Sequence, residues 1–472
     1  MGYIAVIALY LIAIMVYGLV LAHKKVKNTD DMIVGGRKIP YIILVGSLLA
    51  TWCGGGGITG SAGVVYSGGP WVGAITFAAP PIGIILLYFI AGTVRKTNKV
   101  TVPEIMGARY GRSADILSAI CVMLAYIGVL ATQLKAAGNI LVLLCQSSGM
   151  EISIEAATLI CTAIIIVITV GGGMISVAYS DAVSALLMVG GFLVAVPILM
   201  GVAKNAGVSL PEAKTTITGG MSGMTILGYF LPSLALMLGD QNMLQRFASA
   251  KNSDEAKKSN IGMFVGEVIV VAAIIAVCTQ AAKLYQGENE LANAANVIFQ
   301  TAVDYLPFVM GAIVMAACMA FIVTTADSYL LSAATNLTND IYAKYVNKGA
   351  DDKKKMVVLR TTIVVFGFLA AVMTLFFPTV LSLQMTAYTM YGAAITPAIL
   401  FALFSKKVTP AAGVAGILAG GLATIGWTVM GTPGGIQCAI VAVPVSVIVI
   451  LIVTAITKPK AGYGLEELYA EK

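Results

Sequence analysis

Charged residues are scarce in this sequence. They make up 11% of its 472 residues, and hydrophobic residues make up 59%, whereas a soluble domain carries charge at roughly a quarter of its positions. Uncharged apolar stretches of about 20 residues recur along the chain, and this length crosses a ~30 Å hydrocarbon core as a helix. The composition therefore predicts an all-α polytopic membrane protein in contact with the lipid bilayer.

Histidine is almost absent, and cysteine follows no pairing pattern. The one histidine, His23, stands beside Lys24 and Lys25 in a basic loop. This leaves no Ser-His-Asp or Cys-His arrangement and no HExxH zinc motif. The seven cysteines stand singly in apolar runs, as small buried hydrophobes do. We therefore expect neither enzyme activity nor an organic cofactor.

Charges and turn residues divide the chain into thirteen predicted helical spans. An odd number of spans places the two termini on opposite sides of the membrane. The predicted spans lie near 3–22, 38–67, 71–94, 116–144, 152–170, 173–203, 223–247, 259–283, 306–345, 357–377, 379–404, 409–430 and 434–457.

The basic residues gather in alternate loops of this arrangement. With the N-terminus outside, the predicted cytoplasmic segments hold 25 of the 29 Lys and Arg residues, and the outer loops hold Lys204, Lys214 and Lys283. Cytoplasmic loops of membrane proteins carry this excess of positive charge. We therefore expect a multi-pass protein of a bacterial-type plasma membrane, with a cytoplasmic C-terminus. The net charge of +7 follows from this topology and requires no nucleic-acid partner.

Four consecutive glycines, Gly54–Gly57, interrupt the second predicted span. Each glycine costs roughly 1 kcal/mol in a helix relative to alanine, so we expect the helix to break there. Backbone groups freed inside a membrane must be buried in protein or line a cavity, where their carbonyls can hold a cation. A glycine seam for close helix packing is the alternative interpretation.

A second break is predicted at Gly239-Asp240-Gln241, at a comparable depth in its own span. Paired breaks of this kind are typical of an inverted repeat of two five-helix units. The whole chain, 1–472, would then be a single transmembrane transporter domain. Its expected parts are an N-terminal helix and loop (1–37), a first repeat (38–203), a second repeat (223–404), and two extra helices with a short tail (405–472).

Several ionisable residues fall inside the predicted spans, where charge is costly and usually functional. Thr324, Asp327 and Ser328 share one helix face at spacings i, i+3 and i+4, and Asp181 lies at a similar depth. Sodium is satisfied by about five or six oxygens, so this face opposite freed carbonyls is a candidate ion site. Hydroxyls that bond carbonyls of their own helix are the structural alternative.

Three further charges have different expected roles. Lys135 would pair with a solute carboxylate or with an acidic residue of the protein. Asp240, at the second break, would contact an amine-bearing solute. Together they fit a zwitterion such as an amino acid. Glu267 lies near a basic loop and is expected to be structural, meeting Lys258 or Arg246.

Five motifs occur in a characteristic order along nearly the whole chain. They are residues 33–37 (IVGGR), the glycine-broken span up to Tyr66, residues 171–181 (GGGMISVAYSD), residues 323–328 (VTTADS) and residues 339–342 (NDIY). These motifs resemble the sodium/solute symporter family, which has the fold of the bacterial leucine transporter. The resemblance implies sodium as the coupling ion.

The resemblance also implies the residues that would hold sodium. Backbone carbonyls of Ala50, Cys53 and Phe321 and the hydroxyls of Thr324 and Thr325 match the family's conserved sodium site. Some members hold a second sodium, and the matching residues here are Asp181, Thr324, Asp327 and Ser328. Family members commonly have a hydroxyl residue where this chain has Asp327, so a proton at this second site is the alternative.

Within the family, residues 50–56 and 325–328 are most similar to the high-affinity choline transporters. Those transporters would hold a quaternary ammonium on aromatic faces by cation–π attraction, and Trp52 is in place. The tryptophans expected on the third and sixth core helices are replaced near Gly128 and Asp240, which leaves the cage incomplete. The expected solute-binding residues are Thr51, Trp52, Gly54, Gly55, Lys135, Asp240 and Gln241.

The leading hypothesis is a sodium-coupled secondary active symporter that imports a small organic solute by alternating access. The solute would be an amino acid, a carboxylate or an amine, and sodium-dependent choline or quaternary-ammonium transport is the alternative. Hypotheses from other classes are a transporter-like sensor and a sodium-independent facilitator. Sensor relatives usually carry a long signalling domain, whereas only residues 458–472 follow the last predicted span.

Overall fold

The computed structural model of the chain describes residues 2–26 and 29–469, and helices dominate this part of the chain. Twelve helical segments of the described residues are long and apolar enough to cross a membrane, and one bent helix pair raises the number to thirteen. Each of the thirteen coincides with a predicted span. The all-α architecture and the number of spans are therefore confirmed.

The first half of the described chain contains six of these spans, with short helices between them. Its elements are α1 (Gly2–Lys25), α2 (Thr29–Val34), η1 (Gly35–Arg37), α3 (Tyr41–Trp52), η2 (Gly56–Ser61), α4 (Ala62–Gly68), α5 (Pro70–Thr76), α6 (Ala79–Lys96), α7 (Val102–Tyr110), α8 (Arg112–Ser147), α9 (Ile154–Gly171), α10 (Met174–Asn205) and η3 (Glu212–Thr215).

The second half contains the other seven spans. Its elements are α11 (Gly223–Gly239), α12 (Gln241–Ser249), α13 (Ser253–Leu284), η4 (Gly287–Asn289), η5 (Ala294–Asn296), α14 (Val297–Tyr305), α15 (Phe308–Thr335), η6 (Asn336–Val346), α16 (Asp352–Met373), η7 (Thr374–Phe376), α17 (Val380–Ala394), α18 (Thr396–Phe404), α19 (Pro410–Val429), η8 (Pro433–Gly435), α20 (Cys438–Ile456) and α21 (Leu465–Tyr469).

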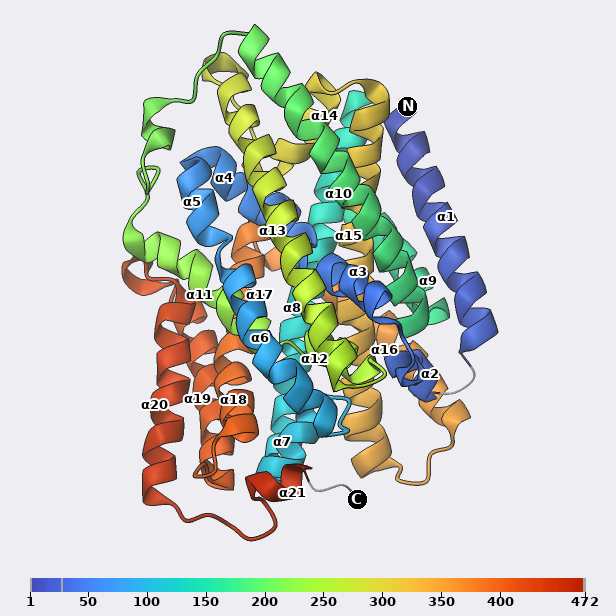
Figure 1. Cartoon of the computed structure of the whole chain (residues 1–472), viewed down its shortest axis with the longest axis vertical. Helices are drawn as coiled ribbons and strands as arrows, with labels where there is room; N and C mark the ends of the chain where they lie inside the picture. Colours follow the sequence, from blue (N-terminus) through green and yellow to red (C-terminus); the bar gives the residue numbers. More distant parts are fainter. Residues whose placement is uncertain (1, 27–28, 470–472) are drawn as a thin grey trace.

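The spans form one elongated bundle with an enclosed centre (Figure 1). Helix α1 lies along one edge, packed on α10 and α15, and α19 and α20 lie along the opposite edge, packed on each other and on α17. Spans α8, α15 and α17 are the most enclosed, whereas most of α1 and α20 is uncovered. Apolar side chains on those outer helices face lipid, which carries no penalty in a membrane.

The structure also contains polar elements that the hydropathy pattern did not predict. Helix α7, capped by Thr101, lies at the same end of the bundle as α21. The guanidinium of Arg109 on this helix donates to the carbonyls of Ser405 and Val408. Arg246, which the charge pattern assigned to a cytoplasmic segment, is fully buried in α12. That assignment was wrong because a short polar helix continues the span inside the protein.

Glycine lets α19 lie directly on the backbone of α17. A Cβ added at Gly420 would be 2.1 Å from the carbonyl oxygen of Ala393, whereas one added at Gly426 on the same helix would meet nothing within 4 Å. Backbone atoms cannot move aside as a flexible side chain can. The contact between these two helices therefore depends on the missing side chain at position 420.

We expect Gly420→Ala to destabilise the protein by about 1–3 kcal/mol, because overpacking forces backbone shifts. The matched control, Gly426→Ala, should be neutral or stabilising by up to about 1 kcal/mol, since alanine favours helix. Thermal unfolding of the purified variants in detergent measures both effects. Equal unfolding temperatures for the two variants would contradict this packing.

Candidate functional site

The second span breaks where the four glycines predict. Helix α3 ends at Trp52, Cys53 leaves helical geometry with ψ of 40°, and the two halves of the span are bent by 55°. A Cβ at Gly54 would lie 2.7 Å from side-chain atoms of Gln133 and Thr325. Glycine is therefore needed here both to end the helix and to admit neighbouring side chains.

The backbone freed by the break is satisfied by a residue that the sequence did not single out. The amide of Gly55 donates to Oε1 of Gln133 on α8 at 2.5 Å. A glutamine inside an apolar span is a weak signal of such a role, because polar residues there need a partner. The hydroxyl of Thr51 instead returns to the carbonyl of Ser47 on its own helix.

The five residues predicted to hold sodium lie on two facing helices. Ala50 and Cys53 are at the end of α3, and Phe321, Thr324 and Thr325 are on α15; all five are buried. The hydroxyl of Thr325 donates to the carbonyl oxygen of Ala50 at 2.8 Å, which joins the broken helix to α15. The hydroxyl of Thr324 lies 3.4 Å from the carbonyl oxygen of Phe321. Oxygen atoms from the end of α3 and from α15 therefore lie close together.

A buried arginine lies between two of the residues predicted for a second cation. Nη2 of Arg246 is 3.4 Å from Oδ2 of Asp181 and 2.8 Å from the hydroxyl of Ser328. Its Nε donates to Ser47 at 2.8 Å, and Ser47 in turn donates to Asp181 at 2.7 Å. The guanidinium therefore supplies a positive charge between Asp181 and Ser328.

Asp327 lies next to this arginine cluster, near Asp181 and Arg246. It is buried in α15 and lines a small cavity between α1, α9, α10 and α15, together with Thr324, Ser176 and Ser180. Its Oδ1 has no hydrogen-bond partner within residues 2–26 and 29–469. Thr324 lines this cavity and also interacts with Asp181, so it links Asp327 to the side of the site that holds Asp181 and Ser328.

Asp240 caps the second broken helix and is surrounded by tyrosines. It ends α11 with ψ of 117° and begins α12, where its Oδ1 accepts from the amide of Asn242 at 2.8 Å. The hydroxyl of Tyr126 also donates to Oδ1, and that of Tyr329 donates to Oδ2 at 2.6 Å. Tyr391 donates to the carbonyl of Gly239. Both oxygens of the Asp240 carboxylate therefore accept hydrogen bonds from groups of the protein.

Gln241 and Lys135 also make their contacts within the protein. The side chain of Gln241 donates to Asn336 and accepts from the amide of Val102. Nζ of Lys135 donates to the carbonyl oxygens of Thr374 at 3.2 Å and Phe377 at 2.5 Å. A cation at this position satisfies carbonyls that the end of a helix leaves free.

A small cavity of about 20 Å³ lies beside the break, between α3, α6, α11, α13 and α17. Trp52 is the one predicted solute-binding residue among those lining it, and its ring centroid is 6.0 Å from that of Tyr388. The volume holds about one water molecule. The lining residues are Trp52, Cys53, Gly57, Ser61, Thr76, Phe77, Pro80, Ser233, Glu267, Val271, Ile274, Gln384 and Tyr388.

Glu267 belongs to this central cavity and not to a basic loop. Its Oε2 accepts a hydrogen bond from the thiol of Cys53 at 3.0 Å, whereas Arg246 pairs with Asp181. The expected structural pairing with Lys258 or Arg246 was therefore wrong. Helix α13 begins at Ser253, so Glu267 lies deeper in the membrane than its distance from the nearest lysines suggested.

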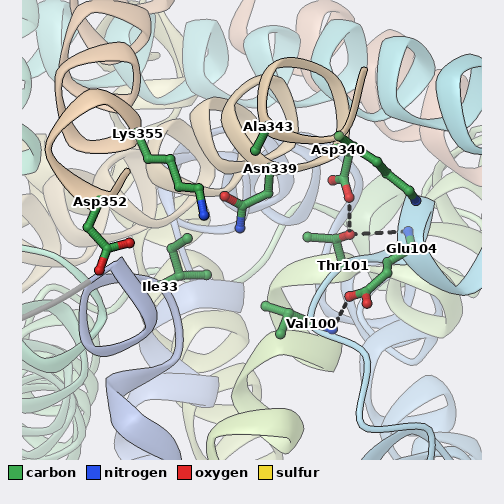
Figure 2. A pocket seen from close by; sticks show the side chains of 10 residues that line it. Ile33, Val100, Thr101, Glu104, Asn339, Asp340, Ala343, Asp352 and Lys355 are labelled. Atoms are coloured by element: carbon green, nitrogen blue, oxygen red, sulfur yellow. Dashed lines mark hydrogen bonds between the residues drawn. The ribbon is translucent and has the colours of Figure 1, made fainter. Parts of the chain in front are cut away.

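A second, larger pocket of about 550 Å³ opens at the end of the bundle that carries α7 (Figure 2). The hydroxyl of Thr101 donates to Asp340 at 2.8 Å, and the amide of Glu104 donates to Thr101 at 3.2 Å. These bonds fasten the start of α7 to η6. The side chain of Gln241 makes a further contact at this end, to Asn336 of η6.

Similar sequences are found among characterised transporters. The chain is 27% identical to High affinity choline transporter 1 of Homo sapiens over 446 residues, which cover 89% of this chain and 75% of that protein. It is 26% identical to the sodium/proline symporter of Haemophilus influenzae over 445 residues, covering 89% of this chain and 86% of that protein.

Similar folds are found among solved transporter structures. A sodium-coupled sialic acid symporter in a substrate-bound outward-open state matches with a TM-score of 0.80 and 19% identity, over 97% of this chain and 98% of that one. A nucleobase-cation-symport-1 family transporter in a closed conformation matches with a TM-score of 0.61 and 14% identity, over 94% of this chain and 100% of that one. These likenesses concern the fold alone.

The sequence model of the sodium:solute symporter family matches residues 32–420, from α2 into α19. The match includes the broken span, the predicted sodium-binding residues and the central cavity. This chain therefore belongs to the sodium:solute symporter family.

Proposed function

We propose that sodium binds between the end of α3 and α15 and drives a small organic solute inward through the central cavity. The carbonyls of Ala50, Cys53 and Phe321 and the hydroxyls of Thr324 and Thr325 are the proposed ligands. The hydrogen bond from Thr325 to Ala50, at 2.8 Å, carries this proposal, because it brings a hydroxyl and a carbonyl from two helices to one point. Hard oxygen ligands of this kind suit sodium.

Coupling requires a part of the protein that contacts both the sodium ion and the solute. Cys53 meets this requirement in the proposed arrangement, because its carbonyl belongs to the sodium set and its side chain lines the central cavity. Sodium would then fix the end of α3 in the geometry that the solute needs. By linkage, each ligand raises the affinity for the other to the same extent.

Alternating access in this proposal is a movement of one five-helix unit against the other. The units are the predicted repeats 38–203 and 223–404, each with an interrupted first helix. Broken helices at the interface of repeats place backbone groups where ions and solutes bind. The bonds around Thr101 and Gln241 would open when the inner side releases its cargo.

Thr325→Ala tests the sodium site without knowledge of the solute. Sodium should raise the unfolding temperature of the wild-type protein above that in potassium at equal ionic strength, because it binds the folded state. We expect the variant to need roughly 10-fold to 100-fold more sodium for the same shift, as for a lost metal contact.

The control for this test is Thr424→Ala. Thr424 is equally buried, but its hydroxyl donates to the carbonyl of Gly420 on its own helix. This variant should respond to sodium as the wild type does. A wild-type protein that unfolds identically in sodium and potassium would refute the site and favour a sodium-independent facilitator.

The number of coupling ions follows from the position of Arg246. We propose that its guanidinium takes the place of a second sodium between Asp181 and Ser328, since it already contacts both side chains. Two positive charges in so small a buried space would repel strongly. Asp327 is then left for a proton, the other cation that the sequence allows at the second site.

Calorimetric titration of the purified protein with sodium should therefore show a single class of site, one ion per chain. Asp327→Asn should leave this stoichiometry unchanged, because the proposed ligands of the one sodium do not include Asp327. A wild-type stoichiometry of two that falls to one in the variant would contradict the proposal and place a second sodium at Asp327.

We propose that the α21 end of the bundle is cytoplasmic, as the distribution of basic residues predicts. The seven native cysteines are buried, so a single exposed cysteine reports its own side. Lys406→Cys and Glu212→Cys place one at each end, both at exposed positions. In intact cells, a membrane-impermeant maleimide should label Glu212→Cys and leave Lys406→Cys unlabelled until the cells are broken. The reverse pattern would invert the orientation.

The relatives leave the solute class open, since they include a choline transporter and a proline symporter. An amino acid, a carboxylate and an amine were all consistent with the sequence. Choline or another quaternary ammonium is favoured by the aromatic pair of Trp52 and Tyr388 on the cavity wall. Gly128 packs against Ala387 and Met373, so the third core helix adds no aromatic ring at that position.

A further inference from the structure

Glu267 introduces a carboxylate into the wall of the central cavity. The residue lies in the membrane-spanning part of α13 and is 1% exposed. Among the described residues, the thiol of Cys53 donates a hydrogen bond to its Oε2. A thiol is a weak donor, so this one contact compensates little of the cost of burying a carboxylate.

No cation of the described chain neutralises Glu267. Among the described residues, Lys99 pairs with Glu104, Arg246 with Asp181 and Lys344 with Asp115. Lys135, another positive charge within the spans, donates to the backbone carbonyls of Thr374 and Phe377. An unpaired charge in a dry interior is expensive, and its retention in a solute cavity calls for a function.

Two other polar atoms of the cavity wall also lack a hydrogen-bond partner. Oε1 of Gln384 and Oγ1 of Thr76 have no partner among the described residues, although these side chains are only 2% and 5% exposed. Both line the cavity beside Glu267. The ring of Trp52 faces the same space and is paired with Tyr388. Acceptors and aromatic faces both attract a cation.

The charges that suggested a zwitterion lie elsewhere. Lys135 and Asp240 do not line the cavity, and the carboxylate of Asp240 is engaged by Tyr126 and Tyr329. The amide of Gly55, freed by the broken helix, already donates to Gln133. A solute carboxylate would therefore find no cation on the cavity wall, and it would be repelled by Glu267.

We propose that Glu267 is the counter-ion of the transported solute, and that the solute is a small organic cation with its charge on an ammonium nitrogen. This inference rests on the proposed function, because it places the solute in the central cavity. The ammonium lies between Glu267 and the face of Trp52, with Gln384 and Thr76 as acceptors for any N–H groups. The cavity, which is about 20 Å³ here, widens to admit it.

The position of Cys53 connects this counter-ion to the sodium site. Its thiol donates to Glu267, and its backbone carbonyl is one of the proposed sodium ligands. Sodium binding at the end of α3 therefore orients the thiol and, through it, the carboxylate. We expect the organic cation to bind more tightly in sodium than in potassium.

Thermal-shift titrations of the purified full chain test the inference. The probes are choline as a quaternary ammonium, ethanolamine as a primary amine and proline as a zwitterion, each in sodium and in potassium. At least one of the two cations should stabilise the wild-type protein, with a larger shift in sodium, and proline should not. The two cations distinguish recognition by aromatic faces from recognition by N–H donation.

Two variants then assign the recognition to Glu267. Glu267→Gln should weaken binding of the cation by roughly 30-fold or more, as for loss of one partner of a buried charge pair. Glu267→Asp keeps the charge and should retain the preference for the cations over proline. The control is Glu288→Gln, which removes an exposed carboxylate in a loop and should bind as the wild type does.

The outcomes separate this inference from the proposed function. Sodium should still stabilise Glu267→Gln, which shows that the variant is folded. Stabilisation by proline alone, by none of the three probes, or by a cation with equal affinity in Glu267→Gln would overturn the inference. The proposed sodium site would survive each of these results, because it fails only if sodium and potassium act alike on the wild type.

Discussion

Hydrocarbon offers no hydrogen-bond partner, so the backbone polar groups that this chain carries into the membrane must be satisfied within the protein. The break after Trp52 makes this constraint acute, because it frees backbone groups in the middle of a span. Gln133 satisfies the amide of Gly55, and Thr325 donates to the carbonyl of Ala50. Two helices far apart in sequence, α8 and α15, are thereby fixed against the break. The proposed sodium site is where these satisfied groups converge.

The same constraint explains how the chain treats its buried charges. Asp181 is paired with Arg246, Asp240 is surrounded by tyrosine hydroxyls, and Lys135 caps the carbonyls at the end of a helix. Each of these groups is compensated by the protein and stabilises one arrangement of helices. Glu267 differs because the described residues supply it with a thiol alone. The proposed counter-ion role follows from this difference, since the missing positive charge can arrive with the solute.

Much of the architecture could be predicted from the sequence. Hydropathy and charge gave the spans, because the length of a membrane helix and the cost of burying charge are local properties. The glycine run predicted the break for the same reason, since helix propensity is set by the residues themselves. The burial of Arg246 could not be predicted in this way, because it depends on the partner Asp181, which lies on another helix. Helix α7, polar and short, carried no hydropathy signal.

The sequence by itself determined that this chain is a helical membrane protein of thirteen spans, broken after Trp52 and related to the sodium:solute symporters. Only the tertiary structure decided which intramembrane charges face the central cavity. Lys135 and Asp240 form hydrogen bonds within the protein, whereas Glu267 lines the cavity. The physical reason is that a charge takes its role from the groups around it. Those groups come from helices that are far away in the chain, as Cys53 is from Glu267, at a separation of 214 residues.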